Sequence, residues 1–431
     1  MSRGLRTLIF FLAFMVPVCG LLPAGVFGQT FSDRYGQTGD WFDTEDVENT
    51  GLTVFPALSI PMGGEYEAMG TAYTAAARDV SFLEANPAAS ASLSYTELAL
   101  FHSNLIADTD LEGLGYTARF DDLGFGVGGK LVHTPFTEYD DFGIQQGSAR
   151  YVETIVAGNI SYNFLNSFYF DGVSAGANLK AGYRRISRGL RDDVREDLLA
   201  VGVMIDVGLL SRLDFLKFYP SRDRNFAVGT VVRNLGPNVL GEPLPTQWSS
   251  GIAYSPLRPV LIGADITVPF TPFSPLPSES VGYAVGTAVT VTDFFTIRSG
   301  FQLKGGNPRI TMGGSVDIQG MTVTINYTLD MTTQLTAFDR FSLQAGFSLG
   351  DRGRGEEQDR IRTLYLDALQ AFAEGDLEKT INFSEQVVEL DPRFQPAAET
   401  LEMAKRMQSL QEQMESIRTG DGTPPDQSVE Q

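Results

Sequence analysis

Apolar and polar residues alternate along most of the chain between residues 95 and 350. The clearest segment is MTVTINYTLDM, residues 321–331, and RFSLQAGFSLG, residues 340–350, repeats the pattern. In the first segment one face holds Met321, Val323, Ile325, Tyr327, Leu329 and Met331, and the other holds Thr322, Thr324, Asn326, Thr328 and Asp330. A period of two is typical of a β-strand whose two faces meet different surroundings.

The same pattern predicts fourteen strands, each of about ten residues, in one uninterrupted array. Their predicted ranges are 95–106, 111–121, 123–135, 147–165, 172–186, 196–209, 225–235, 247–255, 259–270, 279–291, 294–304, 308–318, 321–332 and 340–349. One face carries Thr, Asn, Ser, Gly and charged residues, which suits a wet interior, and the other carries large apolar residues, which suits lipid. A soluble sandwich also alternates, but the strand number and length favour an all-β transmembrane barrel at 94–350.

The connections between the predicted strands also alternate in length, as they do in outer-membrane barrels. Most even-numbered strands are followed by short turns and most odd-numbered strands by longer loops. Two connections depart from this rule: residues 211–224 are long on the short side, and the turn near Gly305 is short on the long side. An even strand number places both barrel ends on the side of the short turns, which is the periplasmic side. We therefore expect the preceding segment to enter the barrel from that side.

The first 28 residues predict a secretory signal peptide. Arg3 and Arg6 precede an apolar run from Leu8 to Val18, and small residues stand before Gln29. The run is short for a transmembrane anchor, and the residues before Cys19 are a poor lipoprotein signal. Cys19 is the only cysteine, so cleavage near Gln29 leaves a mature chain without a thiol or a cysteine metal site.

The formal net charge of −21 argues against a nucleic-acid partner, because phosphate binding needs clustered Lys and Arg. Residues 29–54 form an acidic segment with Asp40, Asp43, Glu45, Asp46 and Glu48. A calcium site there lacks the Gly and terminal Glu spacing of an EF-hand, and a solvated acidic strip fits the composition better. We predict no metal and no cofactor.

The sequence offers few residues for catalysis. The two histidines, His102 and His133, both fall in predicted strands, and no serine stands in a nucleophile motif. Glycines 124, 126, 128 and 129 lie in a strand without a following helix, so they are not a phosphate loop. They are better explained by a bulge or by the close approach of another backbone. We therefore predict that the protein is not an enzyme, although a histidine-dependent lipase on the barrel is an alternative.

The segment before the first strand is rich in small residues and contains four motif-like elements. They are Met62-Gly63-Gly64, an Ala-rich stretch, Arg78-Asp79 and Asn86-Pro87-Ala88. In this order, before a fourteen-strand array, they resemble the start of FadL-like outer-membrane proteins, a family that includes long-chain fatty-acid transporters, PorV-type proteins and treponemal proteins. The resemblance covers about residues 55–350. It implies a monomeric barrel whose lumen is plugged by residues 55–93, with a small-residue helix close to the wall and Arg78 and Asp79 meeting the polar lumen.

The resemblance also implies uptake of a long-chain fatty acid or another apolar ligand across the bacterial outer membrane. Gly128 and Gly129, in the third predicted strand, correspond to the kink through which such a ligand leaves sideways. Two alternatives stay open. One is a PorV-like scaffold for secreted proteins or lipoproteins, and the other is a small-solute porin. Lipid is a further expected partner.

After Gly350 the pattern changes to that of amphipathic helices. Residues 351–419 predict a helical periplasmic domain, in which Ala368, Gly375 and Pro392 match a tetratricopeptide-like repeat. A third helix at 395–417 carries an apolar stripe. One such repeat cannot bury its own face, so we expect this tail to pack on itself or to dock to a periplasmic protein. Residues 420–431 have the composition of a disordered tail.

Overall fold

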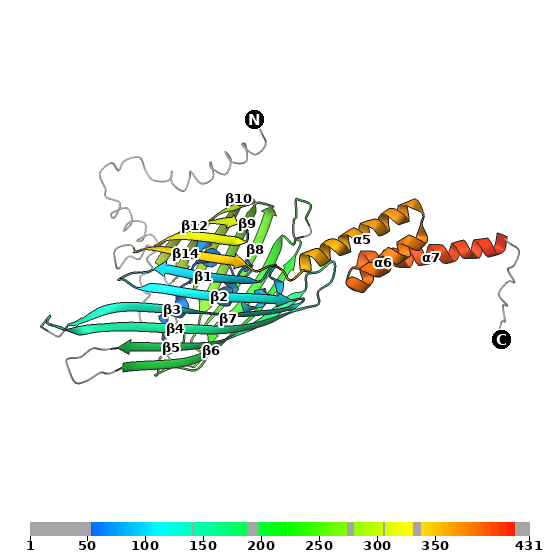
Figure 1. Ribbon diagram of the computed structural model, residues 1–431. Coiled ribbons are helices and arrows are strands. Elements are labelled where there is room, and N and C mark those ends of the chain that lie inside the picture. Colours follow the sequence, from blue (N-terminus) through cyan, green and yellow to red (C-terminus); the bar gives the residue numbers. More distant parts are fainter. Residues whose placement is uncertain are drawn as a thin grey trace, which may run out of the picture.

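The computed structural model describes residues 53–418, except 140–141, 188–196, 222, 274–279, 305–306 and 331–337. The predicted signal peptide, almost all of the acidic segment and the C-terminal tail at 420–431 lie outside the described residues. Fourteen antiparallel strands close into a barrel in which each strand pairs with its sequence neighbours and β1 pairs with β14 (Figure 1). The predicted fold class is therefore confirmed.

The strands follow the predicted ranges within about four residues. They are β1 (Glu97–Asn104), β2 (Asp110–Phe120), β3 (Leu123–Tyr139), β4 (Gln145–Phe164), β5 (Val173–Ser187), β6 (Asp197–Leu213), β7 (Phe226–Leu235), β8 (Gln247–Leu257), β9 (Val260–Pro269), β10 (Gly282–Thr292), β11 (Phe295–Lys304), β12 (Asn307–Ile318), β13 (Met321–Asp330) and β14 (Phe338–Ser348). Strands β3 to β6 are the longest and extend beyond the others at one end (Figure 1).

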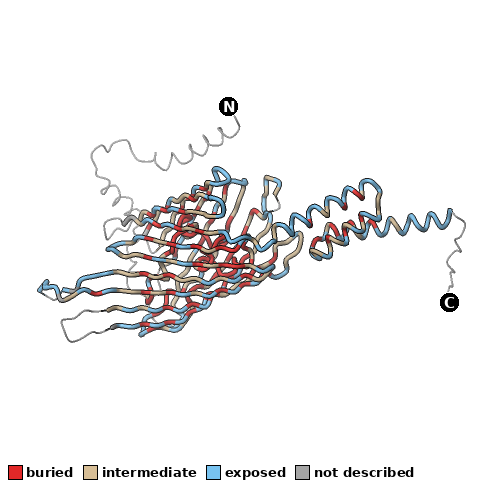
Figure 2. The backbone as a smooth tube through the Cα atoms, viewed as in Figure 1, coloured by how far each residue is buried: buried red, intermediate tan, exposed pale blue. Residues whose placement is uncertain are grey.

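The two faces of each strand meet the surroundings that the alternation predicted. On β13, Thr324 and Asn326 are buried in the lumen, whereas Ile325 and Tyr327 point outward and are nearly half exposed. Buried residues concentrate inside the barrel in Figure 2. Large apolar side chains cover the outside, as an outer-membrane barrel requires; examples are Leu114, Val156, Leu179, Val203, Val285 and Met312. None of the helices in the described ranges is both long and apolar enough to cross a membrane.

The two ends of the barrel differ. We call the end with the connections after odd-numbered strands the loop end, and the opposite end, from which the chain leaves β14, the turn end. Four turn-end connections have only two residues, at 121–122, 258–259, 293–294 and 319–320. The connection at 214–225 is long on this side and the one at 305–306 is short on the other, as the sequence indicated.

Residues 53–93 fill the lumen, and we call them the plug. The plug contains four short helical turns: η1 (Pro56–Ser59), α3 (Gly64–Ala68), α4 (Phe82–Ala85) and η2 (Pro87–Ser92). The prediction of a continuous Ala-rich helix is wrong, because residues 69–81 form turns and bends between α3 and α4. Close contact with the barrel wall, rather than helix propensity, determines the conformation of this stretch.

The direction in which the plug enters also differs from the prediction. The Val54 amide donates a 2.9 Å hydrogen bond to the Pro243 carbonyl in the β7–β8 connection, which lies at the loop end. The chain therefore enters the lumen from the loop end and crosses it to reach the start of β1 at the turn end. The expectation of entry at the turn end assumed that the plug begins and ends at the same end of the barrel. It instead begins at the loop end and ends at the turn end.

A set of lumen-facing glycines allows the plug backbone to touch the wall. A Cβ atom built on any of them would lie closer than 3.0 Å to a backbone atom of the plug; they are Gly124, Gly176, Gly229, Gly263, Gly286 and Gly300, and we call them the glycine belt. Gly263, Gly286 and Gly300 are direct cross-strand partners on β9, β10 and β11. Their plug neighbours are Ala72, Met69 and Gly70, so the plug backbone lies directly against glycines of the wall.

Three helices follow the barrel at the turn end: α5 (Arg354–Glu374), α6 (Leu377–Leu390) and α7 (Gln395–Arg418) (Figure 1). Phe394, before α7, packs edge-on against Phe168 of the β4–β5 connection, with ring centroids 4.8 Å apart. Arg393 forms a 2.7 Å ion pair with Asp122 in the β2–β3 turn. Its hydrogen bond with that carboxylate is the main cause that raises the pKa of the Arg393 guanidinium. The tail is thus docked on the barrel rim.

The glycine belt predicts a sharp difference between two alanine substitutions. Gly286→Ala would place a methyl group against the Met69 carbonyl and should cost about 1–3 kcal/mol, as overpacking usually does. The matched control is Gly158→Ala on β4, where nothing lies within 4 Å of the added Cβ atom. Guanidinium unfolding of both variants in detergent measures the difference, and equal midpoints would contradict close packing between the plug and the wall.

Candidate functional site

Side chains of the barrel wall satisfy the backbone polar groups of the plug. Asp265 accepts hydrogen bonds from the amides of Tyr73 and Thr74, at 3.1 and 2.9 Å. Glu97 and Glu153 accept from other plug amides in the same way, those of Val80 and Ala57. Side-chain amides of the wall donate to plug carbonyls. Asn159 donates to Pro87, Asn178 to Leu83 and Asn326 to Gly64, at 2.9–3.0 Å. An irregular backbone buried in the lumen needs such partners.

Buried ion pairs anchor α3, the first α-helix of the plug, to the wall. Glu67, on α3, pairs with Arg340 and accepts hydrogen bonds from the hydroxyls of Ser342 and Thr328. Glu65, on the same helix, pairs with Arg298 of β11. Removing one partner of a buried pair leaves an uncompensated charge, which is strongly destabilising. These contacts hold the plug to β11–β14.

The residues of the first plug motif contact both the plug and the wall. Met62 is buried, and its amide donates to Glu84 at 2.9 Å. Gly63 and Gly64 both have positive φ, +133° and +66°, and a Cβ atom on Gly64 would collide with the Gln344 side chain. Glycine is therefore required here both by conformation and by space.

The second motif, Asn86-Pro87-Ala88, ends α4 and starts η2. The Asn86 side chain accepts a hydrogen bond from the Ala88 amide and donates to the carbonyls of Thr74 and Leu209. One buried amide thus caps a helix, closes the plug on itself and ties it to β6.

The hydrogen bonds of Arg78 and Asp79 are made to other plug residues. Asp79 is buried, and its partners, the Tyr73 hydroxyl and Ser81, belong to the plug. Arg78 is nearly half exposed and pairs with Glu65 at 3.0 Å. Both residues thus bind plug partners, where the sequence led us to expect contacts with the polar lumen.

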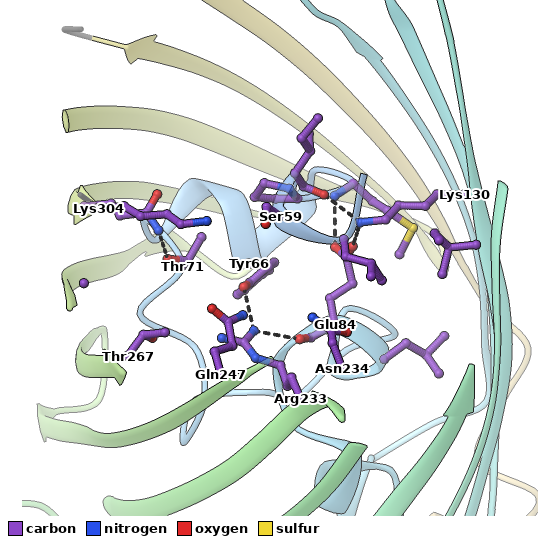
Figure 3. A pocket seen from close by; sticks show the side chains of 18 of the residues that line it. Ser59, Tyr66, Thr71, Glu84, Lys130, Arg233, Asn234, Gln247, Thr267 and Lys304 are labelled. Atoms are coloured by element: carbon purple, nitrogen blue, oxygen red, sulfur yellow. Dashed lines mark hydrogen bonds and ion pairs between the residues drawn. The ribbon is translucent and has the colours of Figure 1, made fainter. Parts of the chain in front are cut away.

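A cavity lies between the plug and the loop end of the barrel (Figure 3). Its volume is about 80 Å³, and it opens to solvent. Its wall residues on β8, β9, β10 and β11, such as Gln247 and Lys304, stand at the loop-end tips of their strands. Apolar lining comes from both the plug and the wall and includes Leu58, Ile60, Pro61, Met62, Leu83 and Ile155.

The charged groups of the cavity are mainly cationic, although the whole chain is acidic. Lys130, Lys180, Arg233 and Lys304 line it, with Glu84 as the carboxylate. Lys130 forms an ion pair with Glu84 at 2.5 Å, and Lys180 forms one with Asp206 at 2.6 Å.

Arg233 is only 7% exposed, yet its three hydrogen bonds reach uncharged oxygens: the Tyr66 hydroxyl, the Glu84 carbonyl and the Ser249 hydroxyl. Its Nε has no hydrogen-bond partner among the described residues. In Figure 3 its side chain points toward Tyr66 and Glu84.

Gly128 and Gly129 line the same cavity, but they do not kink the third strand. The register of β3 with β2 and with β4 runs unbroken through both residues, and the shift within this pairing lies at Glu138 and Tyr139. Gly128 faces the lumen, where an added Cβ atom would meet Leu83 of the plug. The close approach of another chain segment, rather than a bulge, explains this glycine.

The tail residues that matched a repeat lie at the helix ends and in the small tail core. Ala368 is fully buried, and Gly375 ends α5 in the left-handed conformation, with φ of +81°. Pro392 stands between α6 and α7.

Sequence reasoning did not single out Arg233, Asp265, Glu67 or the wall asparagines. The available signal was a charged or amide residue at a lumen-facing strand position, as in LIGADITV around Asp265.

Comparison with known proteins places the chain in a family. The model of the "Uncharacterised protein family (UPF0164)" matches residues 36–351. The chain belongs to this family. Two UPF0164 proteins of Treponema pallidum (strain Nichols) are similar over most of their length. One is 28% identical over 86% of this chain and 87% of its own, and the other is 26% identical over 83% and 76%.

Among solved structures, the "CymD monoaromatic hydrocarbon channel" is similar to this member of UPF0164, with a TM-score of 0.49, 12% identity, and coverage of 71% of this chain and 99% of that one. A Pseudomonas aeruginosa FadL homologue has a TM-score of 0.44 and 11% identity, over 66% and 97%. These likenesses are too distant to assign a role to any residue.

The filled lumen predicts that the intact barrel conducts little. Deleting residues 55–85 removes most plug contacts and should produce steady ion current in planar lipid bilayers, because the wall that remains is polar. Truncation after Gly350 is the control, since α5–α7 lie outside the lumen and their loss should leave the barrel closed. A folded, heat-modifiable deletion variant that conducts no better than the intact chain would show that the plug does not close the lumen.

Proposed function

We propose that the protein is an outer-membrane transport protein that takes up long-chain fatty acids, or similar molecules with an apolar chain and one anionic group. The observation that carries the proposal is Arg233: a buried guanidinium whose Nε has no hydrogen-bond partner among the described residues, on a cavity with apolar lining from Leu58 and Leu83. A buried cation held by neutral oxygens is a strong site for a carboxylate, because charge-assisted hydrogen bonds are about twice as strong as neutral ones.

The rest of the cavity suits an acyl chain. Leu58, Ile60, Met62 and Leu83 present apolar surface from the plug, and Ile155 does so from the wall. Each buried methylene contributes about 0.8 kcal/mol, so a long chain binds without further polar contacts. The cavity lies at the loop end, which is the extracellular end if the short turns and the tail face the periplasm.

Release to the other side requires movement. The plug occupies the lumen beneath the cavity, and β3 is hydrogen-bonded to both neighbours at Gly128 and Gly129. A sideways exit at these glycines would have to part strands that are paired here, whereas an exit through the lumen would have to displace the plug. The plug contacts of Arg233 favour the second route, since a bound anion competes with Tyr66 and Glu84 for the same guanidinium.

A PorV-like scaffold is the second candidate, favoured by the helical tail docked at the turn end. The two candidates differ in what truncation after Gly350 does. A transporter without the tail should keep its uptake of acids, whereas a scaffold should lose the surface that holds its client. A small-solute porin is disfavoured by the filled lumen.

Substitution of Arg233 tests the proposal. Arg233→Gln keeps an amide that can donate hydrogen bonds but removes the charge, and a hydrogen bond to a charged group contributes about 1.5–3 kcal/mol. We expect the affinity for a long-chain acid to fall about tenfold to a hundredfold. Binding by protein in mild detergent, and mass spectrometry of the lipids it retains, measure this.

Two controls separate charge recognition from general damage. Arg212→Gln removes another arginine that donates to the plug, at the Ala77 carbonyl, but does not line the cavity, so acid binding should persist. A fatty alcohol of the same chain length should bind wild type and Arg233→Gln alike. Equal loss of acid and alcohol, or no loss of acid, would refute the assignment of Arg233 as the carboxylate site.

A further inference from the structure

Helix α7 carries a row of exposed apolar side chains. They are Met403, Met407, Leu410, Met414 and Ile417, each at least half exposed. The spacing alternates between four and three residues, which is the spacing of the seam in a two-stranded coiled coil. This row, which we call the α7 seam, continues along α7 from the buried residues Ala397, Thr400 and Ala404, beyond the part of the helix that packs on the tail core.

No other segment of the described chain covers the α7 seam. Helix α6 ends at Leu390 and packs against α7 through Val387 and its neighbours. The remaining residues after Arg418 are TGDGTPPDQSVEQ, which contain two prolines and a single large apolar residue. Among the described residues, the α7 seam thus has no occupant.

The residues beside the α7 seam fit a second copy of the same helix. In a parallel pair, the flanking positions of one helix face those of the other five residues further along. Here these pairs are Arg406 with Gln411 and Gln413 with Arg418. Each arginine thus meets a glutamine, and no two like charges are brought together across the seam.

The membrane also favours this occupant. Two barrels in one membrane have the same orientation, and α7 starts at the rim contact of Phe394 and runs away from the barrel (Figure 1). Neighbouring α7 helices are therefore parallel, and confinement to one membrane raises their effective concentration. A two-heptad seam is short, so this confinement matters for its stability.

We propose that two copies of the protein associate through the α7 seam as a parallel, in-register coiled coil. The contact joins two complete barrels and does not share a lumen between them, so it is independent of the proposed transport function. It is also compatible with a barrel that is monomeric in its membrane part.

Single cysteines test this arrangement in the full-length chain. Cys19 is the only natural cysteine and is replaced by Ser. Leu410→Cys and Met414→Cys place a thiol in the seam, where the Cα atoms of a parallel pair come close enough for a disulfide. Ser409→Cys and Ser416→Cys are the matched controls on the same helix, one and two positions away. Mild oxidation in membranes, followed by non-reducing electrophoresis, reads the result.

We expect a disulfide-linked dimer at both seam positions, in severalfold higher yield than at either serine position. Met407→Glu, added to the Leu410→Cys variant, should abolish the cross-link, because it puts two carboxylates opposite each other. Equal yields at all four positions, or no dimer at the seam positions, would overturn the proposal. So would a seam cysteine that cross-links only to a different protein. Arg233→Gln should leave the cross-link unchanged, which separates this result from the transport test.

Discussion

The structure depends on how an irregular segment is held inside a closed sheet. A barrel satisfies its own backbone hydrogen bonds, but the plug, which is mostly turns, satisfies only part of its own. The wall satisfies others. Asp265 accepts from two consecutive plug amides, and Asn159, Asn178 and Asn326 donate to plug carbonyls. These bonds are short enough only because the glycine belt lets the two backbones touch. Glycine on the wall and Ala, Gly and Thr on the plug therefore both contribute to this close packing.

The same arrangement connects the cavity with the plug. Arg233 lies at the boundary, and its hydrogen bonds hold the Tyr66 hydroxyl on α3 and the Glu84 carbonyl on α4. Glu84 in turn pairs with Lys130 and accepts the Met62 amide. A ligand anion at Arg233 would therefore compete with plug contacts directly, without a relay through the wall. By contrast, Glu67 and Asp265 bind the plug away from the cavity and would hold it while the cavity fills.

Much of the barrel could be predicted because its strands carry an explicit period of two, as on β13, and because the lengths of the connections alternate. The position of the plug could be predicted from the sequence, but its conformation could not. Residues 69–81 have the composition of a helix, yet contacts with Gly263, Gly286 and Gly300 on distant strands determine their conformation. Arg233 and Asp265 could not be identified as partners of the plug, because their heights in the lumen depend on strand register, which no local pattern reveals. Gly128 illustrates the reverse case: a glycine pair suggested a bulge where the real cause is Leu83 of the plug.

The direction of the plug changes how the two ends of the molecule relate. The chain enters at the loop end, so the plug spans the lumen before β1 begins, and its last residues reach the turn end. There Arg354, at the start of α5, donates to the carbonyls of Ser94 and of Leu93, the last plug residue. The first turn of the tail is therefore bonded to the last residues of the plug segment. A force or a partner acting on α5–α7 would reach the plug through these bonds and through the rim contacts at Phe168 and Asp122. The tail is thus linked by hydrogen bonds to the segment that fills the barrel.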